Sequence, residues 1–213
     1  MYRKTMMVHF LISLSLLSAC ASTVPESTSM EERIVMTATQ PVPTITAKPG
    51  SPGYYPLSTR TGIADIDAVL AAVESGDPQQ LRDLVHITTI ACTKAEGLGG
   101  PPKCMQNEAE GTLVKVLPII GPEGQFLREW EISKFPGVYV IGLYAVYSVS
   151  DSAYSEEAYP AGEYAAMFKA GENQPNVVIQ IRGGIVRIDY LYPPISLDET
   201  IQRDASELVL APE

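Results

Sequence analysis

The chain has 213 residues, of which 46% are hydrophobic and 19% are charged, and its formal net charge at pH 7 is −10. This length allows one domain with a substantial core. A chain this acidic is not expected to bind nucleic acid or anionic lipid through charge, so we expect no nucleic-acid partner.

The first twenty residues have the pattern of a secretion signal. A short basic start precedes an apolar stretch from Met6 to about Leu17, too short for a transmembrane helix of about 20 apolar residues. The LSAC sequence that ends at Cys20 resembles the bacterial lipobox. The resemblance implies that residues 1–19 are a lipoprotein signal peptide and that Cys20 carries lipid. The protein would then be anchored to the cell membrane or envelope, with its domain on the extracytoplasmic side.

Residues 20–60 predict a lipidated, disordered tether. Ser, Thr and Pro supply nearly half of this segment and large apolar residues are few. Such a composition buries too little surface to offset the entropy of ordering. The remainder, 61–213, predicts a single globular domain.

The domain should open with two helices. Apolar residues recur at helical spacing from Ile63 to Val73, and Gly76 ends the run. Asp77 is a suitable N-cap for a second helix, with Pro78 in its first position and Gln80 placed for a capping box.

Cys92 and Cys104 bracket a Gly- and Pro-rich loop, TKAEGLGGPPK. Three interpretations are open: a zinc site, a phosphate-binding loop and a disulfide. Zinc would want four ligands, and no second cysteine pair exists. Pro101 and Pro102 remove backbone donors that a phosphate cradle needs. With Cys20 lipidated, the other two cysteines are each other's only partners, which favours a disulfide-closed loop.

The rest of the chain is mainly β in pattern. We expect strands over 110–118, 138–149 and 162–170, and a helix over 122–135 with Phe126, Leu127 and Trp130 on one face. Residues 176–192 predict a hairpin with a two-residue Gly183–Gly184 turn. This register pairs Ile181 with Val186, Ile179 with Ile188, and Val177 with Tyr190 on a core face, and leaves Gln180, Arg182, Arg187 and Asp189 on the other.

A C-terminal helix is expected from the capping pair Ser196 and Glu199 and the apolar stripe Ile201, Ala205 and Leu208. The fold class is therefore α+β, with N-terminal helices packed on a curved antiparallel sheet. This order is similar to the nuclear-transport-factor-2-like and cystatin-like cone folds. The CT, GLGGPPKC and EGT sequences also resemble a module of uncharacterised bacterial envelope lipoproteins, and that resemblance implies no activity.

No catalytic residue, metal ligand or cofactor is predicted. Tyrosines crowd into the β half, where they suit both sheet packing and ligand contact. The candidate ligand or partner surface comprises Lys103, Tyr144, Tyr164, Arg187 and Asp189. The sequence favours a non-catalytic domain that binds an envelope protein or a small ligand. The alternative is a cone-fold enzyme with a carboxylate and tyrosine pocket. A pocket around a carboxyl of raised pKa would favour the enzyme, and an apolar patch beside loop 92–104 would favour a protein partner.

Overall fold

The computed structural model describes residues 53–213. The predicted signal peptide, Cys20 and the tether up to residue 52 lie outside the described residues. Tyr54 and Tyr55, which the prediction assigned to the tether, pack on the domain. Tyr55 is buried, pairs with Leu143, and its hydroxyl donates to the Ala211 carbonyl at 2.8 Å.

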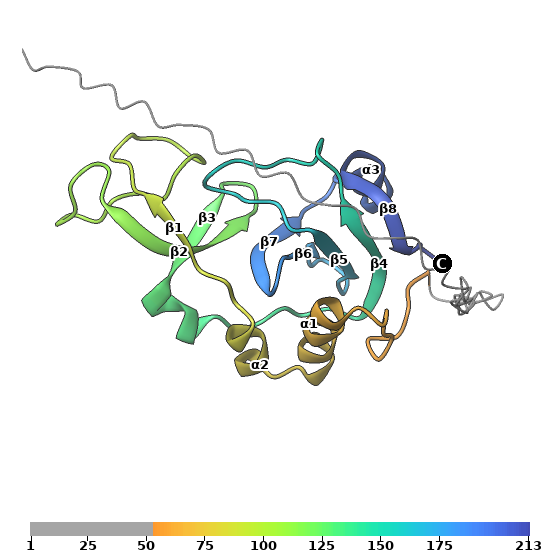
Figure 1. Ribbon diagram of the computed structural model, residues 1–213. Coiled ribbons are helices and arrows are strands. Elements are labelled where there is room, and N and C mark those ends of the chain that lie inside the picture. The colour runs from red at the N-terminus through yellow and green to blue at the C-terminus, as the bar shows by residue number, and fades with distance from the viewer. Residues whose placement is uncertain (1–52) are drawn as a thin grey trace, which may run out of the picture. The chain divides into compact units, whose positions relative to one another are not determined.

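Both predicted N-terminal helices are present. Helix α1 (Ala64–Ser75) ends at Gly76, which adopts the left-handed φ of 64° that glycine permits. Helix α2 (Pro78–Asp83) is capped by Asp77, whose side chain accepts a hydrogen bond from the Gln79 amide at 2.9 Å. In Figure 1 both helices lie on the same side of the sheet.

Residues 53–213 form one sheet of eight strands: β1 (Thr88–Ala91), β2 (Leu113–Ile120), β3 (Gln125–Arg128), β4 (Gly142–Val149), β5 (Tyr164–Lys169), β6 (Asn176–Ile181), β7 (Ile185–Leu191) and β8 (Ala205–Leu210). Their order is β1-β2-β7-β6-β5-β4-β8, with β3 paired to β2 (Figure 1). The predicted α+β class is confirmed. The sheet is mixed and mostly antiparallel, because β2 pairs with β7 in parallel.

The buried hydrophobic side chains form three clusters, of which the two that involve the central strands lie on opposite faces of the sheet. On one face, Ile66, Val69 and Leu70 of α1 pack against Phe168 and Ile179 and their neighbours. On the other face, a short helix, α3 (Leu197–Asp204), covers a smaller cluster. Alternation along the strands sends successive side chains to opposite faces, so each central strand contributes to both cores.

The helix predicted over 122–135 is wrong in its first half. Phe126 and Leu127 lie in β3, and only Glu129–Lys134 is helical, as a 3-10 turn (η1). The reason is a hairpin: Gly124 takes a φ of 61° in the turn after β2, and the edge of β2 is open to pair with Gln125–Arg128. Pairing along this edge overrides the helical spacing of the apolar residues.

The C-terminal helix is shorter than predicted. The Ser196 side chain caps α3 as expected, but the helix stops at Asp204 and the chain continues as β8. Ala205 and Leu208, which the prediction placed on a helical stripe, pair with β4. The open edge of β4 offers hydrogen-bond partners that a longer helix could not use.

The 176–192 hairpin is correct in its strands and two of its three pairs. Val177 pairs with Tyr190 and Ile179 with Ile188, but Ile181 pairs with Ile185 instead of Val186. Arg182 lies in the turn with the two glycines, which makes a three-residue loop with a register shift beside it. Within residues 53–213, no helix is both long and apolar enough to cross a membrane.

Candidate functional site

A cleft of about 740 Å³, here called the α3 cleft, opens between β7, α3, the segment that joins them and the loop 150–162. This size is in the range of small-molecule sites. Its lining residues are Ile120, Gly121, Pro122, Ser152, Tyr154, Val178, Arg187, Asp189, Tyr190, Leu191, Tyr192, Pro193, Pro194, Ile195, Thr200, Arg203 and Asp204.

Strand β7 supplies two buried charged side chains to the cleft. Arg187 and Asp189 are 3% and 7% exposed and, two residues apart, point to the same face. The prediction placed both on the polar face of the hairpin, and the structure buries that face. Arg187 donates from Nε to Asp189 Oδ1 at 2.8 Å and from Nη2 to Oδ2 at 3.1 Å.

Arg187 also fastens loop 150–162 to the sheet. Its Nη1 donates to the carbonyls of Tyr154 and Tyr159, both at 2.9 Å, and its guanidinium lies 5.9 Å from the centre of the Tyr154 ring. Gln180 adds a second link, since its amide oxygen accepts from the Gly162 amide at 3.1 Å while its Nε2 donates to Asp189 at 3.3 Å. The ion pair therefore shapes one wall of the cleft.

Burial raises the pKa of the Asp189 carboxyl above its usual value, and the charge and hydrogen bond of Arg187 offset part of this effect. The raised pKa meets one criterion for an enzymatic carboxylate. Both carboxylate oxygens, however, already accept hydrogen bonds from Arg187 or Gln180. Asp189 is thus held within a closed network.

The last turn of α3 brings a second ion pair to the cleft. Arg203 donates from Nε to Asp204 Oδ1 at 2.6 Å and from Nη2 to Oδ2 at 2.7 Å. The two side chains differ in burial: that of Arg203 is 59% exposed and that of Asp204 is 9% exposed. Among the described residues, none accepts a hydrogen bond from Arg203 Nη1. The Arg203–Asp204 pair can therefore form further hydrogen bonds, whereas Arg187 and Asp189 already use theirs within the protein.

Tyr147 is the nearby polar group without a partner. It is fully buried on the α3 side of β4, and no described residue makes a hydrogen bond to its hydroxyl. Burial, followed by the charges of Asp204 and Asp189, raises the pKa of Tyr147 well above its usual value. The hydroxyl is neutral at physiological pH.

The other predicted surface residues lie elsewhere. Tyr144 donates a hydrogen bond at 2.6 Å to Oδ1 of Asp198 in the first turn of α3, and burial together with that bond raises the pKa of Tyr144 to about 12. Tyr164 packs against the α1-side core. Lys103 lies on the disulfide loop. Of the five candidates, only Arg187 and Asp189 are brought together.

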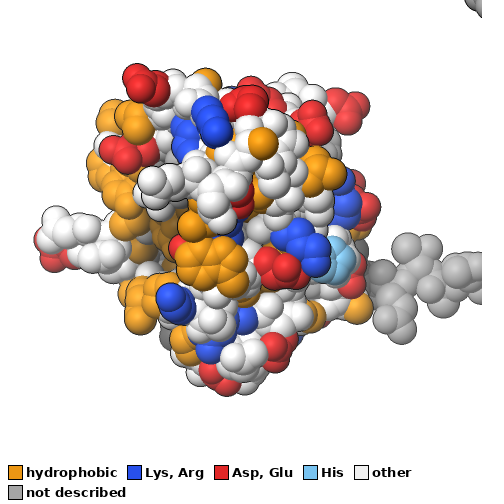
Figure 2. Space-filling model, turned by 90° about the vertical axis from the view of Figure 1, so that its left-hand side faces the viewer, with side chains coloured by type: hydrophobic (Ala, Val, Ile, Leu, Met, Phe, Trp, Pro, Cys, Tyr) orange, Lys and Arg blue, Asp and Glu red, His pale blue; other side chains and the backbone are white. Residues whose placement is uncertain are grey.

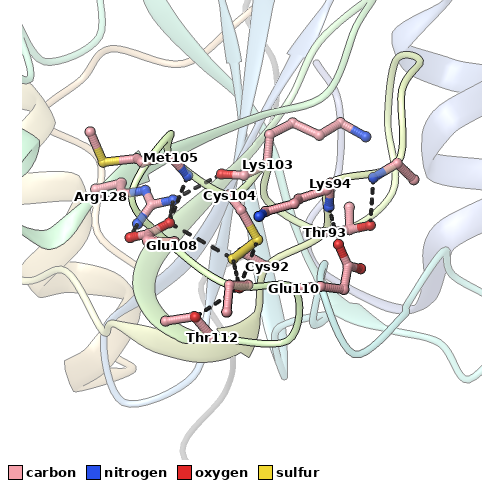
Figure 3. Close-up of a disulfide and its surroundings, with 12 residues drawn as sticks. Cys92, Thr93, Lys94, Lys103, Cys104, Met105, Glu108, Glu110, Thr112 and Arg128 are labelled. Carbon is pink, nitrogen blue, oxygen red and sulfur yellow. Dashed lines mark hydrogen bonds and ion pairs between the residues drawn. A yellow bond between two sulfur atoms is a disulfide. The ribbon is translucent and has the colours of Figure 1, made fainter.

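The predicted disulfide is confirmed: Cys92 and Cys104 are joined, with their Cα atoms 4.9 Å apart (Figure 3). Glu108 lies against it, and its carboxylate accepts hydrogen bonds from Arg128 Nη1 and Nη2, at 2.6 and 2.8 Å, and from the Met105 amide at 2.7 Å (Figure 3). The Arg128 hydrogen bond, followed by that of the Met105 amide, holds the pKa of Glu108 below its usual value. This side chain ties the loop to β3.

Glu108 and the two cysteine sulfurs are close enough together to suggest a metal site, since their ligand atoms lie within 4.8 Å of one another. A metal would require thiolates, and the disulfide removes them. At this position the described residues of the loop therefore form a disulfide cross-link, and the two cysteine sulfurs are not metal ligands.

A second depression, here called the loop groove, lies between the disulfide loop and the β3–η1 segment. It has a volume of about 550 Å³, and its apolar rim includes Leu98, Met105 and Trp130, which are 76%, 45% and 56% exposed. Figure 2 looks at this end of the domain and shows hydrophobic side chains gathered in patches among charges of both signs. An apolar patch beside loop 92–104 favours a protein partner at this surface.

Sequence reasoning missed Arg203 and Asp204, because the predicted helix continued through them to Leu208. It also missed Gln180 as a bridging residue, since an amide on the polar face of a hairpin is usually solvated.

Comparison of the chain with protein-family models, with curated proteins and with solved structures finds no match.

Proposed function

We propose that this protein is a lipid-anchored extracytoplasmic binding domain whose ligand site is the α3 cleft. The observation that carries the proposal is the cleft itself, with apolar walls above two ion pairs. Buried polar groups that fix orientation within a mainly apolar cleft are typical of small-molecule sites. The disulfide supports an oxidising compartment, and the signal and LSAC sequences support the anchor.

The anchor is tested by intact mass. The full chain expressed in a bacterial host should lack residues 1–19, carry lipid on Cys20, and gain two alkyl groups only after reduction. A Cys20→Ser variant should lose the lipid and keep the disulfide. A wild-type chain that retains its N-terminus without lipid would refute the anchored protein.

The binding site is tested by placing a larger side chain in the α3 cleft. Ile195 is 48% exposed in the α3 cleft, and Ile141 is 50% exposed outside it, so Ile195→Trp and Ile141→Trp are matched substitutions. Saturation-transfer difference NMR of the full chain in detergent, with sugars, amino acids, nucleotides and polyamines as probes, should give at least one signal that Ile195→Trp removes and Ile141→Trp retains. Equal signals from both variants, or no bound probe, would refute the site.

A second candidate function is the docking of an envelope protein at the loop groove, which the exposed Leu98 and Trp130 favour. The first described residues of the chain lie beside β4, where Tyr55 pairs with Leu143. The loop groove lies among β1, β2 and β3, at the other end of the strand order. A photo-crosslinking residue at position 130 should capture one discrete protein in intact cells. The same residue at exposed position 139 should capture none.

The alternative of an enzyme with a carboxylate and tyrosine pocket rests on Asp189 alone. Its support is the raised pKa in a cleft beside Tyr154, and its weakness is the closed network around the carboxylate. Prolonged incubation of any bound probe should leave its mass unchanged if the domain only binds. A product that disappears in an Asp189→Asn variant would establish the enzyme instead.

A further inference from the structure

The charges of the α3 cleft cancel in pairs. The lining contains two arginines and two aspartates, and each arginine is bound to the aspartate nearest to it in sequence. A charged ligand would find no unmatched counter-ion and would have to disrupt a pair to gain one. An uncharged ligand can bind without disrupting either ion pair.

The Arg203–Asp204 pair nevertheless faces the cleft with unused capacity. Arg203 keeps Nη1 as a donor, and each Asp204 oxygen accepts only one hydrogen bond among the described residues. A donor and acceptors therefore lie side by side. Neighbouring hydroxyl groups match this arrangement, since one can accept from the guanidinium while the next donates to the carboxylate.

The walls of the cleft offer flat, rigid apolar surfaces. Tyr154 and Tyr192 are 46% and 43% exposed, and Pro193 and Pro194 adjoin Tyr192. An aromatic ring combines an apolar face with a polar tip, which suits a ligand whose C–H face is apolar and whose edge carries hydroxyls. The volume of about 740 Å³ accommodates more than a single sugar ring.

We propose that the α3 cleft binds an uncharged saccharide, with the sugar hydroxyls on the Arg203–Asp204 pair and a sugar face on Tyr192. This inference rests on the proposed function, because it names the ligand class of the same cleft. Unlike a nucleotide or a polyamine, a neutral sugar leaves both ion pairs intact. Arg187 and Asp189 act below the sugar as positioning residues that hold loop 150–162.

The test is a glycan array followed by titration of the full chain in a detergent without a sugar head group. Neutral oligosaccharides should bind, and the dissociation constant should change less than twofold between 50 and 500 mM NaCl, on the order expected when no charge pairs with the ligand. Tyr192→Ala should weaken binding about tenfold or more, as the loss of a stacking ring does. Tyr139→Ala, which removes another exposed ring, should not weaken it.

The outcomes separate this inference from the proposed function. If neutral saccharides fail and a nucleotide or polyamine binds in a manner that Ile195→Trp abolishes, the cleft is a binding site and the saccharide class is wrong. If saccharides bind equally well to wild type, Tyr192→Ala and Ile195→Trp, the saccharide site is not in this cleft. If nothing binds, both proposals fail.

Discussion

Arg187 and Asp189 form a two-pronged ion pair on one face of β7, and the same guanidinium also holds the carbonyls of Tyr154 and Tyr159. The pair joins the sheet to loop 150–162 from beneath the α3 cleft. A buried pair of this kind contributes little to stability as a unit, yet it is costly to leave half complete.

We therefore expect Arg187→Met to lower the free energy of unfolding by about 3–5 kcal/mol, because Asp189 is left buried without its counter-charge. Asp189→Leu should lower the free energy of unfolding by a similar amount, because Arg187 is then buried without its counter-charge. The double variant should lose clearly less than the sum of the two. Urea denaturation of all four proteins measures this coupling, and additive losses would show that the two side chains act independently.

Glu108 should make the folding stability of the domain depend on pH in the acid range. Its pKa is lowered in the folded protein, chiefly by the hydrogen bond from Arg128. The folded state therefore binds this proton less readily than the unfolded chain, whose glutamate titrates near 4.3. The stabilisation is present above about pH 4.3 and is lost as the pH falls through the lower folded pKa.

Glu108→Gln should remove that part of the acid dependence. Thermal midpoints of the wild type and the variant, recorded from pH 7 to pH 2, should differ at neutral pH and converge at the acid end. Curves that stay parallel over the whole range would mean that the ion pair does not stabilise the loop.

Gly162 and Gly171 are a matched pair of loop glycines with opposite expectations. A Cβ atom on Gly162 would lie 2.5 Å from the Ile181 amide nitrogen and 2.6 Å from the Tyr164 carbonyl oxygen, whereas one on Gly171 would meet nothing within 4 Å. We expect Gly162→Ala to lower stability by about 1–3 kcal/mol through overpacking against backbone. Gly171→Ala should change it by less than about 0.5 kcal/mol. Equal effects in denaturation experiments would contradict the close approach at Gly162.

Tyr147 and Tyr55 provide a similar contrast for hydroxyl groups. The buried Tyr147 hydroxyl has no partner among the described residues, whereas that of Tyr55 donates to Ala211 at 2.8 Å. Tyr147→Phe should leave stability unchanged or raise it by up to about 1 kcal/mol, since it removes an unsatisfied polar group. Tyr55→Phe should cost about 1 kcal/mol. A larger loss in Tyr147→Phe than in Tyr55→Phe would show that the Tyr147 hydroxyl is hydrogen-bonded.

Local signals in the sequence were sufficient for several features. Gly76 and Asp77 mark the junction of α1 and α2, the pairing of Cys92 with Cys104 follows from their being the two cysteines left once Cys20 is assigned to lipid, and alternation along 176–192 predicts β6 and β7. Each depends on residues near one another in the chain, where spacing, backbone preference and cap chemistry act directly.

Tertiary structure decided what depends on distant partners. Phe126 and Leu208 have helical spacing but lie in strands, because open edges of β2 and β4 were available to pair with them. The α3 cleft has the same origin: Arg187 becomes a buried clamp only when loop 150–162 folds over it, and Asp204 reaches the cleft only when α3 packs on the sheet. Sequence spacing sets which way a side chain points along its own strand or helix. What it meets there is set by packing between segments far apart in the chain.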